Sequence, residues 1–271
     1  MACAAANEAA SVGIESFSVA HSVDSYGSSA FELVVSNRYD HLGRRVQKIT
    51  PEATYTCFYD GWLLVKEVVE RSGDTRRCGV SPRHCGGAGS STSFGEDAAG
   101  SRVSMEEDVI EYHWGKDLSG TIGGARGVGG LLYVKINGDI YVPWYDACGN
   151  IIGYWDAEGH IVAEYTYDAF GKLIASSGPM ADVFSFRYST KYFDPETGFY
   201  YYGYRFYSPE LMRWITRDPI GEEGGVNLYA MCDNSPIEAF DEIGLWSATS
   251  ESAGQSRRVY KFEQGDTMET F

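Results

Sequence analysis

A tyrosine-rich stretch at residues 186–207 reads Phe186-Arg187-Tyr188-Ser189-Thr190-Lys191-Tyr192-Phe193-Asp194-Pro195-Glu196-Thr197-Gly198, then Phe199-Tyr200-Tyr201-Tyr202-Gly203-Tyr204-Arg205-Phe206-Tyr207. The run from Asp194 to Gly198 has proline at the second position of a turn and glycine where a left-handed residue is needed, so it predicts a hairpin. Alternation in the next strand predicts that Arg205 shares a face with Tyr201 and Tyr207. We therefore expect paired strands with an arginine set among aromatic rings.

Two matching turns follow this hairpin, Asp218-Pro219-Ile220-Gly221 and Asp241-Glu242-Ile243-Gly244. In the simplest interpretation each aspartate caps its own turn. If the fold brings Asp218 and Asp241 together, one can keep a proton while the other stays charged, as an acid–base pair requires. A nearby Arg205 could then hold one carboxylate ionised or stabilise developing negative charge. The residues alone leave both interpretations open.

Two Ser-Pro pairs lie between Arg205 and Asp241. Ser208-Pro209 and Ser235-Pro236 each combine a good N-cap residue with proline at a first helical position. They predict short helical turns that interrupt the strands.

Upstream, short units repeat an aromatic residue, an aspartate and a glycine. Tyr145-Asp146, Trp155-Asp156 and Tyr167-Asp168 begin 10 and 12 residues apart, and glycine follows each aspartate by three positions. Aspartate can bind the backbone of the turn that it opens, and glycine supplies the positive φ that closes it. Weaker units lie at 37–46 and 55–67. Units this short cannot bury an apolar face alone, so we expect them to stack.

Aromatic–Asp–x–x–Gly units that lead into a tyrosine-rich core resemble the YD repeats and RHS repeat-associated core domain of bacterial polymorphic toxins. They are also similar to the C subunits of insecticidal toxin complexes. The resemblance covers residues 31–70 and 109–245. It implies a ribbon of β-hairpins that spirals into a hollow shell closed at one end by the core. In that family the core cuts its own chain and releases a C-terminal toxin segment.

The resemblance also implies which residues make the cut. Asp218, Asp241 and the upstream Arg205 match the catalytic positions of the family, and the bond to be broken joins Leu245 to Trp246. The second turn usually reads Asp-Pro-x-Gly, whereas Glu242 stands here in place of proline. This difference frees φ at that position and adds a third carboxylate. The segment after the cut is too short to fold into a toxin enzyme.

We therefore expect an all-β fold, a spiralling antiparallel β-hairpin ribbon with a C-terminal plug that contains short helical turns. The expected segments are a poorly ordered start at 1–30, first YD-like strands at 31–70, YD repeats at 109–178, the RHS-associated core at 179–245 and a short tail at 246–271. Residues 71–108 would form a disordered insertion. Gly, Ser, Arg and Cys dominate that segment, and its few large apolar side chains cannot offset the ordering entropy.

Composition narrows the class of partner. The 271 residues include 20 Tyr, 13 Phe, 6 Trp and 32 Gly, which is typical of short strands and tight turns. A net charge of −16 disfavours binding to nucleic acid. The six cysteines form no Cys-x-x-Cys pair and the Gly-rich run at 120–130 lacks a phosphate-loop ending, so we expect no metal site and no cofactor.

No secretion signal and no apolar run of the ~18 residues needed to span a bilayer is seen. We therefore expect a chain that is cytoplasmic before any specialised export. Expected partners are further shell segments or a B-like shell subunit of a toxin complex, with immunity or secretion proteins as other candidates.

Two further hypotheses remain open from the sequence. Aromatic side chains exposed on strands, with Trp155 and Trp214 as candidates, would suit contacts with carbohydrate or with a cell surface. The chain could instead be a degenerate, inactive remnant of an RHS shell.

Overall fold

The computed structural model describes residues 34–71 and 107–245, together with the backbone of five short strands outside them. These short strands are β1 (Ser18–Val19), β2 (Ser22–Val23), β3 (Ser29–Ala30), β8 (Ser93–Glu96) and β9 (Arg102–Met105). The predictions of a poorly ordered start at 1–30, of a disordered insertion at 71–108 and of a tail at 246–271 fall almost entirely outside the described residues.

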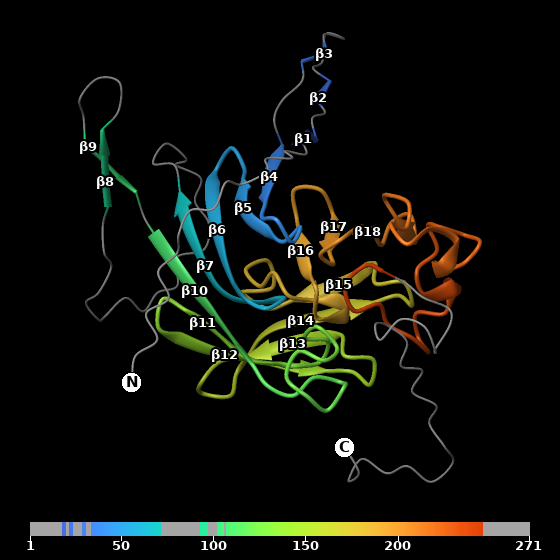
Figure 1. The fold of residues 1–271 in the computed structure, drawn as a ribbon. Helices are drawn as coiled ribbons and strands as arrows, with labels where there is room; N and C mark the ends of the chain where they lie inside the picture. The colour runs from blue at the N-terminus through green and yellow to red at the C-terminus, as the bar shows by residue number, and fades with distance from the viewer. Residues whose placement is uncertain are drawn as a thin grey trace, which may run out of the picture.

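Antiparallel strands in sequence order make up most of the structure (Figure 1). The large sheet contains β4 (Val35–Tyr39), β5 (Arg45–Ile49), β6 (Ala53–Asp60), β7 (Leu63–Arg71), β10 (Glu107–Trp114), β11 (Leu131–Ile136), β12 (Asp139–Tyr145), β13 (Ile151–Trp155), β14 (Ile161–Tyr167) and β15 (Leu173–Ser177), with β1 paired at the edge of β4. Within this sheet each strand pairs with the sheet's previous and next strand, and β2–β3 and β8–β9 form separate pairs. The predicted all-β ribbon of hairpins is confirmed.

The ribbon is continuous across the gap between residues 71 and 107. β7 pairs directly with β10, with Glu70 opposite Glu107 and Lys66 opposite Glu111. The intervening residues therefore leave one strand and return to its immediate neighbour.

Aspartate explains why the strands turn where they do. Asp40, Asp146, Asp156 and Asp168 each accept hydrogen bonds through Oδ1 from the amides two and four residues later, at 2.7–3.1 Å. The glycine three positions after each aspartate has φ between +76° and +85°, which side-chain-bearing residues rarely adopt. The Asp-x-x-Gly repeat thus forms the same type of turn at four places in the chain.

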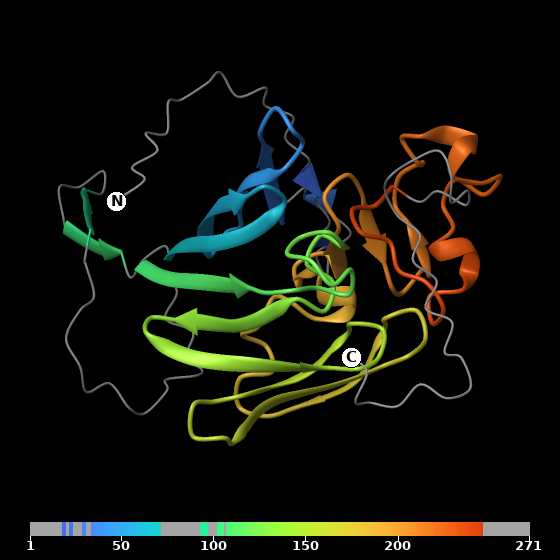
Figure 2. The ribbon, with the colours of Figure 1, turned by 60° about the horizontal axis from the view of Figure 1, so that its bottom comes forward.

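A second, four-stranded sheet forms the C-terminal core. Its strands are β16 (Tyr192–Asp194), β17 (Phe199–Tyr201), β18 (Phe206–Ser208) and β19 (Arg213–Trp214), and its 3-10 helices are η1 (Tyr188–Thr190), η2 (Gly221–Gly224) and η3 (Cys232–Asn234). The core, coloured orange to red, gathers at one end of the large sheet in both views (Figures 1 and 2). Aromatic rings join the two parts, since Phe184, which leads into the core, stacks on Tyr154 of β13 with ring centroids 3.8 Å apart.

Charged side chains also join the sheet to the core. Arg45 and Lys48 of β5 are almost fully buried, and both pair with Asp194 of β16, at 2.5 Å and 3.3 Å. Lys48 also lies 3.2 Å from Glu196. We call Arg45, Lys48, Asp194 and Glu196 the sheet–core charge cluster. It spans about 150 residues of sequence, so no local pattern predicts it.

Beside this cluster lies a buried acid, Glu67 of β7. Tyr192 and Tyr112 donate their hydroxyl groups to its carboxylate at 2.9 Å and 3.2 Å. Burial raises the pKa of Glu67, against the lowering effects of Lys48 and of the Tyr192 hydroxyl group.

The predicted hairpin in the core forms. Asp194 lies opposite Phe199, and the amide of Gly198 donates to the carbonyl of Asp194 at 2.8 Å. Proline and glycine therefore act as the sequence indicates.

The strand after this hairpin differs from the prediction. β17 ends at Tyr201, and the chain turns back to begin β18 at Phe206. Tyr202 donates its amide to the carbonyl of Arg205 at 3.1 Å, and Gly203 has φ +118°. The shared strand face predicted for Arg205 was therefore wrong, because glycine permits a turn at this point.

The Ser-Pro pairs form single hydrogen-bonded turns. Ser208 Oγ accepts from the amide of Leu211 at 3.2 Å, and the carbonyl of Ser235 accepts from the amide of Glu238 at 3.1 Å. The short helices of the core begin elsewhere. Within the described residues no helix has the length and apolar character needed to cross a bilayer.

Candidate active site in the core

The turn that ends β17 places Arg205 inside the core. Its side chain is 1% exposed, and the guanidinium carbon lies 4.2 Å from the ring centroid of Trp214 in β19. Stacking on an aromatic ring was expected of this arginine, although the ring belongs to tryptophan rather than to the neighbouring tyrosines. Gly203 allows the turn because it has a positive φ, and the ring of Trp214 is the flat surface on which the guanidinium stacks.

Arg205 brings together the two aspartates singled out from the sequence. Its Nη2 lies 2.7 Å from Oδ2 of Asp218 and 3.5 Å from Oδ2 of Asp241. The two carboxylate oxygens therefore lie within about 6 Å of each other. Asp241 is fully buried and Asp218 nearly so. Residues separated by 13 and 36 positions from Arg205 thus share one cation.

Each aspartate also caps its own turn. Asp218 Oδ1 accepts from the amide of Ile220 at 3.1 Å. Asp241 Oδ1 accepts from the amides of Ile243, Gly244 and Leu245 at 3.1, 2.7 and 3.2 Å. The structural and the functional interpretations of these residues are therefore compatible.

The electrostatics of the site are set by burial. Burial raises the pKa of Asp241, while Arg205 and the three amides lower it. Burial lowers the pKa of Arg205, while Asp241 and Asp218 raise it. An acid that keeps a proton more readily than usual thus lies beside a carboxylate in contact with a cation, as acid–base chemistry requires.

The turn that begins at Asp241 leads directly to the bond of interest. Arg205 Nε donates to the carbonyl of Gly244 at 2.5 Å, and Leu245 is half-buried. Gly244 has φ +78°, and a Cβ on it would lie 3.1 Å from the backbone nitrogen of Arg205, so the position favours glycine. Trp246, the other half of the predicted cleavage site, lies outside the described residues.

Glu242 occupies the position where the family usually has proline. It is 6% exposed, and burial raises its pKa, with Lys191 and Arg126 lowering it. Its carbonyl accepts a hydrogen bond from Lys191 Nζ at 2.7 Å. The freedom predicted for this position is therefore restrained by a side-chain contact.

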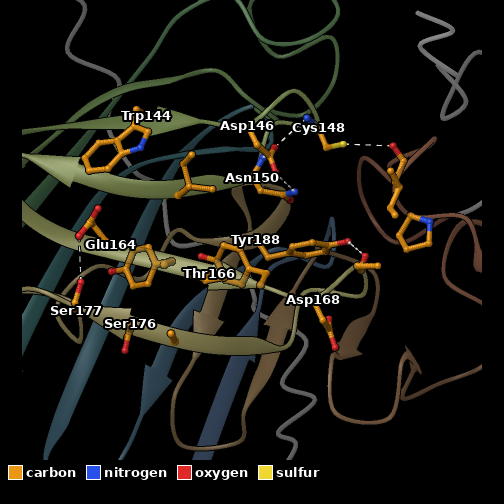
Figure 3. A pocket seen from close by; sticks show the side chains of 17 residues that line it. Trp144, Asp146, Cys148, Asn150, Glu164, Thr166, Asp168, Ser176, Ser177 and Tyr188 are labelled. Atoms are coloured by element: carbon orange, nitrogen blue, oxygen red, sulfur yellow. Dashed lines mark hydrogen bonds between the residues drawn. The ribbon is translucent and has the colours of Figure 1, made fainter.

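An open groove of about 640 Å³ lies elsewhere, on the ends of β12 to β15 (Figure 3). Its lining includes none of Arg205, Asp218 and Asp241. Several of its polar groups bind one another, as Glu164 does with Ser177 at 3.2 Å. The groove is distinct from the aspartate site.

In the described part of the chain, one group of side chains has donor atoms close enough to hold a metal ion. Ligand atoms of Asp156, Glu158 and His160 lie within 4.8 Å of one another. Asp156 already binds the amides of the other two in its repeat turn. The group is explained by that turn and carries no argument for an ion.

The carbohydrate hypothesis loses one of its two residues. Trp214 is fully buried beneath Arg205, so the proposal that it contacts a sugar was wrong. Trp155 is 42% exposed and stacks on Trp144 with ring centroids 4.7 Å apart.

Comparison with known proteins indicates the family to which the chain belongs. The family described as Teneurin YD-shell matches residues 124–237. Toxin subunit YenC1 of Yersinia entomophaga is 34% identical over 116 residues, which are 42% of this chain and 11% of that protein. Double-stranded DNA deaminase toxin A of Burkholderia cenocepacia is 34% identical over 220 residues, 76% of this chain and 13% of that protein. The chain is a YD-repeat protein of the RHS type.

The fold agrees with solved structures. The complex of TcdB2 and TccC3 without its hypervariable C-terminal region has a TM-score of 0.56 and 22% identity, over 83% of this chain and 10% of that one. The RHS chain described here thus spans about a tenth of the length of these relatives. Its YD repeats form a structural shell segment, as the sequence predicted.

Some residues of the site escaped sequence reasoning. Trp214, which supports Arg205, was interpreted as a surface residue. Leu228, whose carbonyl accepts from Arg205 Nη1 at 3.4 Å and from the amide of Asp218 at 3.0 Å, carries no chemical signal in the sequence. In the sequence Trp214 follows Arg213, but nothing in that pair indicates that its ring lies against Arg205.

Proposed function

We propose that the core of this shell segment cuts its own chain between Leu245 and Trp246. Asp218 and Asp241 form the acid–base pair, and Arg205 holds both. The observation that carries the proposal is the contact of one buried guanidinium with two aspartates, of which Asp241 lies four residues before Leu245. The site is buried in the core, so its substrate is the chain itself rather than an external peptide.

The chemistry consumes one water molecule. Asp218 accepts a proton from the water molecule as the water oxygen attacks the carbonyl carbon of Leu245. The carbon–nitrogen bond then breaks, and the amine of Trp246 takes a proton from Asp241. The products are a carboxyl group on Leu245 and a free amine on Trp246. Burial supports these roles because it favours the protonated form of Asp241.

The local backbone supports the proposal. Asp241 holds the amide of Leu245, and Arg205 holds the carbonyl of Gly244, so the residues before the bond are fixed on both sides. Fixing reacting groups in place is a large part of catalytic rate enhancement.

The short span of the chain relative to its relatives supports a proposal about its partners. Because it spans about a tenth of its relatives, we propose that further RHS shell segments or a toxin-complex B-like subunit complete the enclosure. Immunity or secretion proteins are additional candidates.

Intact mass spectrometry after purification tests the cleavage. The expected result is a species that ends at Leu245, present for the wild type and absent for Asp218→Asn and for Asp241→Asn. Asp168→Asn, in a repeat turn outside the site, is the matched control and should be cut normally. A single wild-type species at 29.9 kDa would contradict the proposal.

A second candidate is carbohydrate binding on the sheet, which the exposed Trp155 favours. Tryptophan faces stack on sugar rings. A glycan array should then show binding that Trp155→Ala removes and Trp62→Ala does not. No binding by the wild type on such an array would eliminate this candidate.

A further inference from the structure

Three consecutive carbonyl groups in the turn after Asp241 are held by side chains or backbone of the core. The carbonyl of Glu242 accepts from Lys191 Nζ at 2.7 Å, that of Ile243 from the amide of Tyr204 at 3.1 Å, and that of Gly244 from Arg205 Nε at 2.5 Å. The amides on the other side are held by Asp241. Of the three donors, Lys191 is the one charged side chain to which no role has been given.

Lys191 is buried, and among the described residues it has no direct ion pair. It is 5% exposed, and its two hydrogen-bond acceptors are backbone carbonyls, those of Glu242 and, at 3.3 Å, Arg126. Its Nζ also lies 5.4 Å from the ring centroid of Tyr202. A buried ammonium group is costly unless its donors are satisfied, so a lysine with this arrangement needs an explanation.

The second acceptor belongs to the Gly-rich loop that sequence analysis left without a function. Asp117 holds that loop by accepting from the amides of Ala125 and Gly127 at 2.8 Å and 3.2 Å. Phe240, directly before Asp241, packs on Ala125 of the same loop. Lys191 therefore bridges the loop and the turn.

The charged groups around Lys191 come from both of these elements. Asp241 and Glu242 belong to the turn, and Asp117 and Arg126 to the loop. Burial lowers the pKa of Lys191 to about 8, while the three carboxylates raise it and Arg126 lowers it further. Lys191 is among the residues that line a cavity of about 50 Å³, which is large enough for a water molecule.

We infer that Lys191 is a positioning residue for self-cleavage, which in its ammonium form holds the carbonyl of Glu242 and thereby the turn that carries Asp241. The inference rests on the proposed self-cleavage. Proline fixes φ at this position in related turns, and here the Lys191 contact holds the carbonyl of the same residue. Hydrogen bonds from an ammonium group are stronger than those from a neutral amine, so the turn is held less firmly once the proton is lost.

Cleavage rates of purified full-length variants between pH 6 and 9.5 test the inference. Lys191→Met, which keeps the length of the side chain without a donor, should cut about 10- to 100-fold more slowly at pH 7. The wild-type rate should fall about fivefold around pH 8, and Lys191→Arg, which stays charged, should lack this fall. Lys172→Met removes an exposed lysine paired with Glu210 and should behave as wild type. A merely structural lysine would alter the rate without altering the pH profile.

A second measurement does not depend on cleavage. In the uncut Asp218→Asn chain, the NMR chemical shift of the Glu242 carbonyl carbon should change with pH, with a midpoint near pH 8. Adding Lys191→Arg should abolish this change. If the wild type never cuts but this titration is seen, self-cleavage is refuted and the positioning contact stands. The inference is overturned if the Lys191→Met chain cuts at the wild-type rate, or if the chemical shift of the Glu242 carbonyl carbon shows no pH-dependent change near pH 8.

Discussion

Replacing Asp194 with asparagine tests whether the large sheet and the core are held together by buried charge. Asp194 is the shared acceptor of Arg45 and Lys48, and both cations have side chains no more than 2% exposed. Asparagine keeps the size of the side chain and removes its charge. Arg45 then has no carboxylate partner among the described residues, whereas Lys48 keeps Glu196 at 3.2 Å.

The magnitude follows from the loss of one partner. Removing one member of a buried ion pair costs about 3–5 kcal/mol because the remaining charge stays buried. For a folded region of this size, each kcal/mol lowers Tm by roughly 2–4 °C, so Asp194→Asn should lower Tm by roughly 6–20 °C. Glu196→Gln is the matched control. Its side chain is 16% exposed and Lys48 keeps Asp194, so the expected cost is about 0–1 kcal/mol.

Urea unfolding followed by tryptophan fluorescence measures both variants. Asp194→Asn should shift the midpoint without changing the slope, as a loss of stability requires. Equal midpoints for Asp194→Asn and Glu196→Gln would refute the argument that buried charge joins the two parts. A wild-type chain without a cooperative transition would favour the hypothesis of a degenerate remnant.

Three further predictions concern other parts of the chain. Burial raises the pKa of Glu67, so the stability that its neutral form contributes is complete below about pH 4.5 and is lost as pH rises through the raised pKa. Urea unfolding at pH 5 and at pH 8 should therefore show that Glu67→Gln gains stability relative to the wild type at pH 8. Asp168→Ala removes two amide contacts at 2.9 Å and should cost about 1 kcal/mol in urea unfolding, and a cost below the error of the measurement would contradict the account of the repeat turns. Gly244→Ala adds a Cβ at φ +78° beside Arg205 and should slow self-cleavage in the mass assay more than Gly159→Ala in a repeat turn, while equal rates for the two would count against a tightly fixed turn.

Local patterns predicted the elements that local chemistry determines. Asp156 and Asp168 open the turns that their spacing with glycine indicates, and the hairpin between Asp194 and Phe199 follows from proline and glycine. Only the resemblance to a known family favoured a joint site for Asp218 and Asp241, since each aspartate equally satisfies its own turn.

What escaped prediction depends on contacts between distant residues. Alternation could not reveal the turn at Gly203, because tyrosines on both sides are compatible with a longer strand. Arg45 and Glu67 look like ordinary polar positions of surface strands, and they become buried only because the core packs over them. Lys191 lies in the tyrosine-rich stretch at residues 186–207, yet the carbonyl that accepts its hydrogen bond belongs to Glu242, 51 residues away.

The direct pairing of β7 with β10 has a consequence for how such a chain can change. The register across this pair runs from Glu70 opposite Glu107 to Lys66 opposite Glu111, so it is defined by pairs between the two strands themselves. Whatever sequence joins the two strands can therefore be lengthened, shortened or exchanged while every backbone hydrogen bond of the sheet is kept. This junction is a natural place to graft a reporter or a foreign domain onto the shell.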